Sequence, residues 1–211
     1  MKVICISDTH CKHGFIPNLP EGDMIICAGD ISSRGYPWEI ENFLYWFNSL
    51  DYKYKILIAG NHDFYFESNK KEAKKMLKKY PTVIYLENSQ KIIEGIKIYG
   101  SPVQPTFFNW AFNVDRGEPI KQIWQKIPKD TDILITHGPA FGHGDYVYFD
   151  NKHVGCVDLL KKIEQIKPKF CIAGHIHNGH GVTKNEHTTF INASVVNEEY
   201  EIAYEPIIFE I

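Results

Sequence analysis

Five short clusters of candidate metal ligands follow one another along the chain, and each comes directly after an apolar run rich in β-formers. The clusters are Asp8-Thr9-His10, Gly29-Asp30, Gly60-Asn61-His62-Asp63, Thr136-His137-Gly138 and Gly174-His175-Ile176-His177. The preceding runs cover residues 3–6, 24–27, 56–58, 133–135 and 170–172. Side chains that leave neighbouring strands at their carboxyl ends converge in space, so five such loops can assemble one site.

The clusters offer oxygen and nitrogen ligands without a thiolate. The candidate metal ligands are Asp8, His10, Asp30, Asn61, His137, His175 and His177. Carboxylate and amide oxygens suit hard divalent ions, and imidazole suits zinc, iron, nickel and manganese. A lone histidine is more often a structural residue than a metal ligand. If the residues of these clusters were all structural, however, the five clusters would have to lie at strand ends by chance. The pattern therefore predicts a two-metal hydrolytic centre, in which a carboxylate such as Asp30 can bridge the ions.

Length and composition favour one packed domain spanning residues 1–211. Of the 211 residues, 44% are hydrophobic and 14% aromatic, which is enough for a substantial core. The formal net charge of −3 gives no general reason to expect a membrane partner or an extended nucleic-acid surface. The lysines between residues 70 and 79 fit the solvated side of a helix better than an anion-binding patch. Five cysteines, an odd number, indicate reduced thiols, and we expect a soluble cytoplasmic protein.

Hydrophobic periodicity predicts a mixed α/β arrangement. Strands are expected over residues 2–7, 23–28, 55–59, 83–86, 90–94, 96–100, 132–136 and 169–173, and helices over 37–50, 68–79, 119–126 and 155–166. Residues 101–118 are predicted to form a long loop. Three β-rich segments at 180–184, 188–192 and 206–211 are predicted to pair as antiparallel neighbours. These patterns favour two sheets packed face to face with helices outside.

At the five clusters the chain resembles the calcineurin-like metallophosphoesterase superfamily, whose pattern is DxH, GD, GNH(D/E), H and GHxH at strand ends. All five blocks are present between Asp8 and His177. The resemblance implies an α/β fold, a four-layer αββα sandwich of two mixed β-sheets flanked by helices. It also implies a site that holds two divalent metal ions.

The resemblance further implies a role for each matched residue. The first ion would be bound by Asp8, His10, Asp30 and His177, and the second by Asp30, Asn61, His137 and His175. His62 would protonate the leaving oxygen or stabilise its charge, and Asp63 would orient His62.

A narrower likeness extends over nearly the whole chain. Outside the metal clusters it rests on Ser101-Pro102, residues 109–113 with Arg116-Gly117, Gly155-Cys156 and Asn192-Ala193-Ser194, which look like the metallophosphoesterase-domain (MPPED, 239FB-type) branch. This likeness implies a phosphodiesterase that acts on small phosphodiesters, cyclic nucleotides included, by attack of a metal-bridging hydroxide. Manganese is the metal it implies first, with iron, zinc or nickel as alternatives.

Two arginines are candidate substrate-binding residues because a guanidinium pairs well with phosphate. Arg34 lies in a stretch similar to the GDxxxRG segment of serine/threonine protein phosphatases. A phosphate-binding residue and an exposed loop residue are equally favoured interpretations of Arg34. Arg116, in the aromatic loop, is a weaker candidate for a phosphate or base contact. Trp110 and Phe112 could stack on a nucleobase, although packing at the edge of the core is favoured.

Three other functions fit the same ligands. A phosphomonoesterase, including a protein phosphatase, gains some support from Arg34. A nuclease would use identical chemistry, but the sequence shows no extended basic surface for a polynucleotide. The third alternative is a binding scaffold that keeps the metallophosphoesterase fold with weak catalysis. It is disfavoured because such scaffolds tend to lose metal ligands or the catalytic acid, whereas here all seven ligand positions and His62 are intact.

Overall fold

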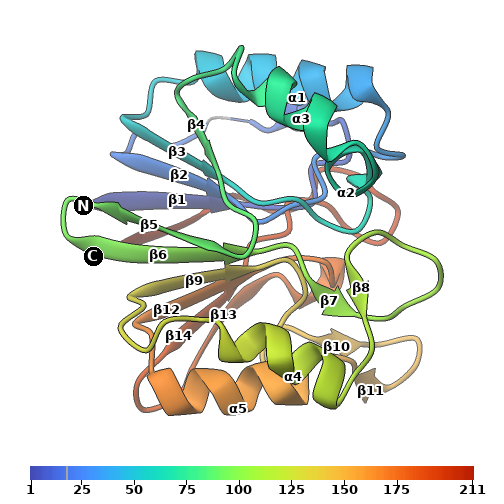
Figure 1. Cartoon of the computed structure of the whole chain (residues 1–211), viewed down its shortest axis with the longest axis vertical. Helices are drawn as coiled ribbons and strands as arrows, with labels where there is room; N and C mark the ends of the chain where they lie inside the picture. Colours follow the sequence, from blue (N-terminus) through green and yellow to red (C-terminus); the bar gives the residue numbers. More distant parts are fainter. Residues whose placement is uncertain (18) are drawn as a thin grey trace.

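Two large mixed β-sheets pack face to face in the computed structural model, which describes residues 1–17 and 19–211 (Figure 1). The first sheet has the order β15-β1-β2-β3-β4. In it β1 (Lys2–Ile6), β2 (Met24–Cys27), β3 (Tyr54–Leu57) and β4 (Val83–Tyr85) are parallel, and β15 (Ile207–Glu210) is antiparallel to β1.

The second sheet has the order β13-β14-β12-β9-β6-β5. Its inner strands β14 (Thr189–Asn192), β12 (Phe170–Ala173), β9 (Ile133–Thr136) and β6 (Ile96–Ser101) are parallel. At the two edges β13 (Gly181–Lys184) and β5 (Ser89–Ile93) run antiparallel to their neighbours.

Helices cover the outer face of each sheet. Over the first sheet lie α1 (Pro37–Ser49), α2 (Phe64–Ser68) and α3 (Lys70–Leu77), and over the second lie α4 (Glu118–Gln125) and α5 (Val157–Ile166) (Figure 1). The predicted four-layer αββα sandwich is confirmed. The helices in the described part of the chain are all too short or too polar to cross a lipid bilayer.

The alternation of side chains along each strand explains the layers. In β1, Val3 and Cys5 belong to the apolar cluster between the sheets, whereas Ile4 and Ile6 belong to the cluster under α1. Successive strand side chains point to opposite faces, so a strand covered on both sides reads as a continuous apolar run. Each ligand cluster is preceded by such a run, because each follows a strand of the interior.

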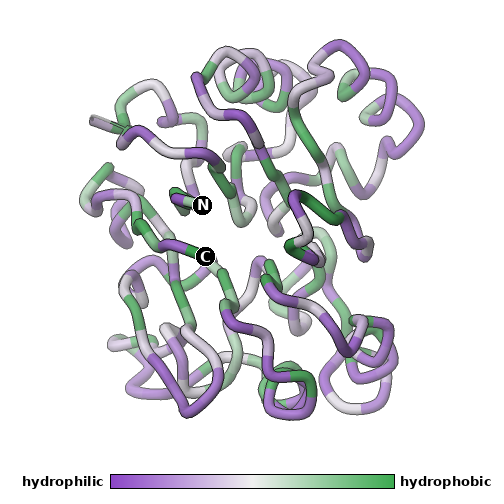
Figure 2. The backbone as a smooth tube through the Cα atoms, turned by 90° about the vertical axis from the view of Figure 1, so that its left-hand side faces the viewer, coloured by the Kyte–Doolittle hydropathy of each residue, from purple (hydrophilic) through white to green (hydrophobic). Residues whose placement is uncertain are grey.

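The last strand corrects one prediction. Strands β13 and β14 pair antiparallel as expected, but β15 crosses to the first sheet and pairs with β1. The prediction that all three tail segments are antiparallel neighbours is therefore wrong for β15. Phe209 of β15 stacks on Phe170 of β12 at 3.9 Å, so this strand also joins the two sheets. The two termini consequently lie close together (Figure 2), with the Met1 ammonium donating to the Ile211 carbonyl.

Several short elements lie outside the predicted helices and strands. The long loop contains β7 (Gln104–Pro105) and β8 (Asn113–Val114), which pair with each other, and a hairpin is formed by β10 (Tyr146–Val147) and β11 (Lys152–His153). Two 3-10 turns occur at His13–Phe15 (η1) and His177–Gly179 (η2). Two-residue strands carry no periodic pattern, so the sequence does not reveal them.

Candidate metal centre

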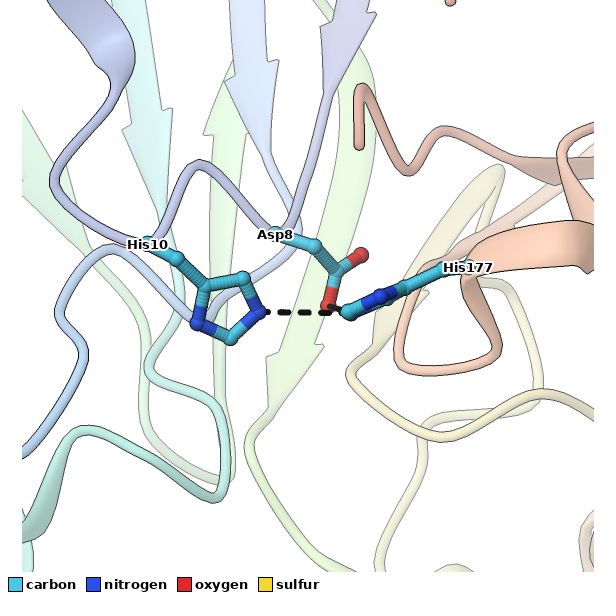
Figure 3. Close-up of side chains that lie close together, drawn as sticks. All are labelled: Asp8, His10 and His177. Atoms are coloured by element: carbon cyan, nitrogen blue, oxygen red, sulfur yellow. Dashed lines mark hydrogen bonds and ion pairs between the residues drawn. The ribbon is translucent and has the colours of Figure 1, made fainter. Parts of the chain in front are cut away.

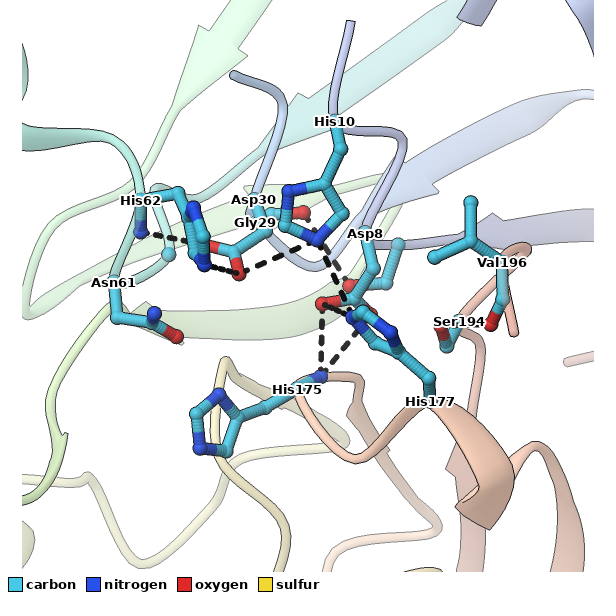
Figure 4. A network of polar contacts seen from close by, with 12 residues as sticks. Asp8, His10, Gly29, Asp30, Asn61, His62, His175, His177, Ser194 and Val196 are labelled. Carbon is cyan, nitrogen blue, oxygen red and sulfur yellow. Dashed lines mark hydrogen bonds and ion pairs between the residues drawn. The ribbon is translucent and has the colours of Figure 1, made fainter. Parts of the chain in front are cut away.

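Five parallel strands end at one place and deliver the predicted ligands there. The loops after β1, β2 and β3 come from the first sheet, and those after β9 and β12 come from the second. Together they carry Asp8, His10, Asp30, Asn61, His137, His175 and His177. Figure 4 shows six of them close together, and His137 joins them through contacts with Asp30 (3.3 Å) and Asn61 (2.9 Å). This is the convergence expected from strand ends.

One group of ligand atoms comes from Asp8, His10 and His177, all within 4.8 Å of one another. The Nε2 atoms of His10 and His177 lie 3.3 Å apart, and His177 Nε2 lies 3.9 Å from Asp8 Oδ1. The two rings point toward each other beside the carboxylate (Figure 3). Two imidazole nitrogens and one carboxylate oxygen that face a common point are a fitting donor set for one divalent ion.

A second group joins Asp30, His137 and His175, again within 4.8 Å. Asp30 Oδ2 lies 3.3 Å from His137 Nε2 and 3.7 Å from His10 Nε2. Asn61 Oδ1 is 2.9 Å from His137 Nε2. The single carboxylate of Asp30 therefore adjoins both groups.

Main-chain carbonyls hold four of the histidine rings in place. Each carbonyl accepts from Nδ1, which fixes the hydrogen there and directs the Nε2 lone pair of the neutral ring to the cluster. The pairs are His10 with Ser32 (3.2 Å), His62 with Ser33 (2.8 Å), His137 with Ala28 (2.8 Å) and His177 with Asn197 (2.9 Å). Support of this kind orients metal-binding imidazoles in proteins.

The backbone at the strand ends is tightly turned. Asp8, His10, Asp30 and His175 all have positive φ, between 40° and 69°, a region that non-glycine residues seldom occupy outside special sites. At Gly174 a Cβ would overlap the Asp8 carboxylate and the Ser7 hydroxyl. The glycine of the last cluster is therefore required because the loop passes directly against a ligand.

The electrostatics of the cluster match a cation. Burial alone would raise the pKa of Asp30, but positive charge on His137, His62 and His10 holds it well below its usual range. Burial lowers the pKa of His10 to about 4. Burial also opposes protonation of His137, yet the Asp30 carboxylate outweighs it and raises the His137 pKa to about 9. A buried carboxylate that attracts a proton onto its neighbour would attract a divalent ion in the same way, so the donor set fits a metal.

The two predicted catalytic residues have different surroundings. His62 donates its main-chain N–H to Asp30 Oδ1 at 2.8 Å, and its Nε2 lies 4.0 Å from Asp30 Oδ2. Asp63 is fully buried and accepts from Gly60 N (2.8 Å) and from Ser32 N (3.0 Å). Burial, together with the Asp30 charge, raises the Asp63 pKa to about 6. Asp63 therefore joins the loops after β2 and β3, while the His62 ring is held by Ser33.

A cleft of about 670 Å³ opens over the cluster. Asp30, His62 and His177 line it at the metal end, and Arg116 and Lys152 line it as well. The Arg116 guanidinium donates to the carbonyls of Gly155 (2.8 Å) and Val154.

The structure separates the other predicted contact residues. Arg34 is exposed and is not among the residues that line the cleft, so its predicted contact with phosphate stays a prediction. Phe112 is buried in the core under α1. Trp110 lines the cleft, where its ring stacks on His62.

Two residues at the site were given no catalytic role by sequence reasoning. The Tyr200 ring packs edge-on against His10 at 4.7 Å and His177 at 5.1 Å, and it lines the cleft. Its neighbours are glutamates, a pattern typical of an exposed turn, so no sequence signal marks it. Asn192 donates from Nδ2 to the carbonyls of Gly144 (2.9 Å) and Ile176 (2.8 Å). It therefore supports the loop that carries His175 and His177.

Known proteins share both the sequence and the fold. A family model described as calcineurin-like phosphoesterase matches residues 1–179. The chain is 38% identical over 231 residues to Metallophosphoesterase domain-containing protein 1 of Homo sapiens, covering 100% of this chain and 71% of that protein. UPF0046 protein C25E10.12 of Caenorhabditis elegans is 39% identical over 228 residues, with coverage of 100% and 81%.

Among solved structures, TT1561 of Thermus thermophilus has the same fold. It matches with a TM-score of 0.63 and 14% identity over 90% of this chain and 88% of that chain. The motifs, the ligand geometry and the family match agree with one another. The chain therefore belongs to the calcineurin-like phosphoesterase family and is a metal-dependent phosphoesterase.

Proposed function

We propose that this chain is a dinuclear phosphodiesterase that hydrolyses small phosphodiesters, cyclic nucleotides or related nucleotides among them. The observation that carries the proposal is the position of Asp30, whose Oδ2 lies 3.3 Å from His137 Nε2 and 3.7 Å from His10 Nε2. One buried carboxylate that belongs to the second ligand group and adjoins His10 of the first suits a pair of neighbouring ions.

The ligands divide between two positions. The first ion would be held by Asp8, His10, Asp30 and His177, and the second would be held by Asp30, Asn61, His137 and His175. Manganese is the metal we favour, with iron, zinc or nickel as alternatives, because the set mixes imidazole with carboxylate and amide oxygen. Two divalent ions bound here would neutralise the phosphate and lower the pKa of water shared between them.

His62 acts on the leaving group. Its Nδ1 is occupied by the Ser33 carbonyl, so Nε2 is the nitrogen that can carry a proton to the substrate. The oxygen of water forms a new P–O bond as the bond from phosphorus to the leaving oxygen breaks. The leaving oxygen keeps the electron pair of the broken bond and receives the proton from His62 Nε2. Asp63 supports this step indirectly, by fixing the loops on either side of the ring.

The cleft limits the substrate. A volume of about 670 Å³ accommodates a small phosphoester, and the charges along its wall are mixed, with Asp150 and Glu198 beside Arg116 and Lys152. This favours a small diester over a polynucleotide, which needs an extended basic surface. Arg116 lines the cleft, which supports a contact with the phosphate or with a second polar group of the substrate. A protein phosphatase remains the second candidate through Arg34, although that residue is exposed.

The test compares a diester with its matching monoester. Manganese-loaded protein is assayed on bis-p-nitrophenyl phosphate and on p-nitrophenyl phosphate, with chelator-treated protein as the control. We expect a higher kcat/KM for the diester and no turnover after chelation. A clear preference for the monoester would contradict the phosphodiesterase assignment and favour a phosphatase.

A further inference from the structure

The indole ring of Trp110 lies flat against the imidazole of His62. The ring centroids are 4.1 Å apart and the planes are inclined by 29°. Phe64 packs against the same indole at 5.9 Å. Because His62 covers one face of Trp110, that face is not free to stack on a substrate base.

The loop that carries Trp110 is tied to the segment that carries His62. The N–H of Ala111, the next residue, donates to the carbonyl of Asn61 at 3.1 Å. The N–H of Phe112 donates to the Glu67 carboxylate at 2.7 Å. These main-chain bonds fix the indole relative to the imidazole and do not depend on the indole itself.

The His62 ring packs edge-on against the His10 ring at 4.6 Å, and two further contacts act on its tilt. The bond from Nδ1 to the Ser33 carbonyl, 2.8 Å long, fixes one edge of the ring but allows it to tilt about that bond. The flat contact with Trp110 opposes such a tilt, because tilting drives the imidazole into the indole face. The hydrogen bond and the indole face together restrict the direction of Nε2.

We propose that Trp110 is a positioning residue for proton delivery by His62. The inference rests on the proposed role of His62 as the acid that protonates the leaving oxygen. Proton transfer requires a short and well-aligned approach of donor and acceptor, so a ring that is free to tilt transfers its proton less often. Trp110 touches neither the leaving oxygen nor the metal ligands' donor atoms in this role; it acts through the orientation of His62.

The experiment measures how the rate depends on the leaving group. Trp110→Ala, Trp110→Phe and His62→Ala are assayed with manganese on diesters whose leaving groups range from nitrophenol to simple alcohols. Trp38→Ala is the matched control, since Trp38 is 66% exposed on α1 and is not among the residues that line the cleft. Thermal melting and bound manganese are measured for every variant.

We expect Trp110→Ala to lower kcat by roughly tenfold or more for alcohol leaving groups. The loss should be much smaller for nitrophenol, which leaves without protonation. Manganese content and KM should stay near those of the unchanged chain, and Trp110→Phe, which keeps a flat face, should recover most of the rate. Trp38→Ala should behave like the unchanged chain.

Other outcomes separate this inference from the function it rests on. If Trp110→Ala lowers kcat equally for all leaving groups, changes only KM or loses manganese, Trp110 does not position the acid. If His62→Ala shows the leaving-group dependence and Trp110→Ala does not, only this inference is wrong. If His62→Ala itself lacks that dependence, the acid role of His62 is wrong and the positioning role with it.

Discussion

Replacing Asp30 by asparagine should weaken both metal positions while it leaves the fold intact. The Asp30 carboxylate belongs to the second ligand group and also adjoins His10 of the first. Asparagine keeps the shape and an oxygen that can accept the His62 N–H, which lies 2.8 Å from Oδ1 of Asp30, but it removes the negative charge. Both ions lose the same ligand charge in one substitution.

The size of the effect follows from the distances. At an effective dielectric constant of about 20, two unit charges about 4 Å apart attract each other by about 4 kcal/mol, so a carboxylate and a divalent ion at that separation attract each other by about 8 kcal/mol. The carboxylate must be dehydrated to bind, which offsets part of this attraction. If about 3 kcal/mol remains, the affinity for each ion falls by roughly a hundredfold, since about 1.4 kcal/mol corresponds to a factor of ten.

Equilibrium dialysis against buffered manganese measures that affinity, with the bound metal counted per chain. Asp51→Asn is the control, because Asp51 is exposed and lies outside the ligand groups. Diester turnover should fall by orders of magnitude in Asp30→Asn and not in the control. Two manganese ions bound with unchanged affinity in Asp30→Asn would refute the bridging role.

Three further substitutions test separate parts of the account. His177→Ala should weaken the first metal position by roughly tenfold or more and leave the second partly loaded; unchanged metal affinity and rate in a manganese titration would remove His177 from the site. Arg116→Ala should raise KM for diesters with little change in kcat, and an unchanged KM would mean that Arg116 only joins two loops. The third concerns stability, because burial lowers the pKa of His13, whose Nδ1 is buried without a hydrogen-bond partner among the described residues. Because the folded chain holds the His13 pKa below its ordinary value of 6.5, the unfolded chain takes up a proton first as pH falls, and folding stability is lost. The melting temperature should therefore drop between about pH 7.5 and 5.5, and it should drop less steeply in His13→Leu. Equal slopes of melting temperature against pH in the two chains would contradict this.

The metal cluster could be predicted because its signal is local. Each ligand stands at the end of a strand that is buried on both faces, so the apolar run and the polar residues after it are adjacent in the sequence. The parallel order of β1, β2 and β3, and of β9 and β12, then brings these ends together. The layers follow from the same runs, since strands covered on both sides need helices outside.

What the sequence did not reveal depends on contacts between distant segments. Tyr200 reaches His10 and His177 from a turn that Asn197 holds to the His177 ring, and an acidic segment does not indicate such a contact. The pairing of β15 with β1 depends on which sheet edge is open, which local pattern does not encode. A motif-like stretch also marked Arg34, which is exposed and is not among the residues that line the cleft, so its contact with phosphate stays a prediction.

The central claim is that two ions bound in this cluster are needed for diester hydrolysis. The most direct test is to titrate the metal-free chain with manganese while bound metal and bis-p-nitrophenyl phosphate turnover are measured on the same samples. Two ions should bind per chain, and turnover should rise as the second position fills. A single bound ion at full activity, or turnover that persists without metal, would contradict the dinuclear account.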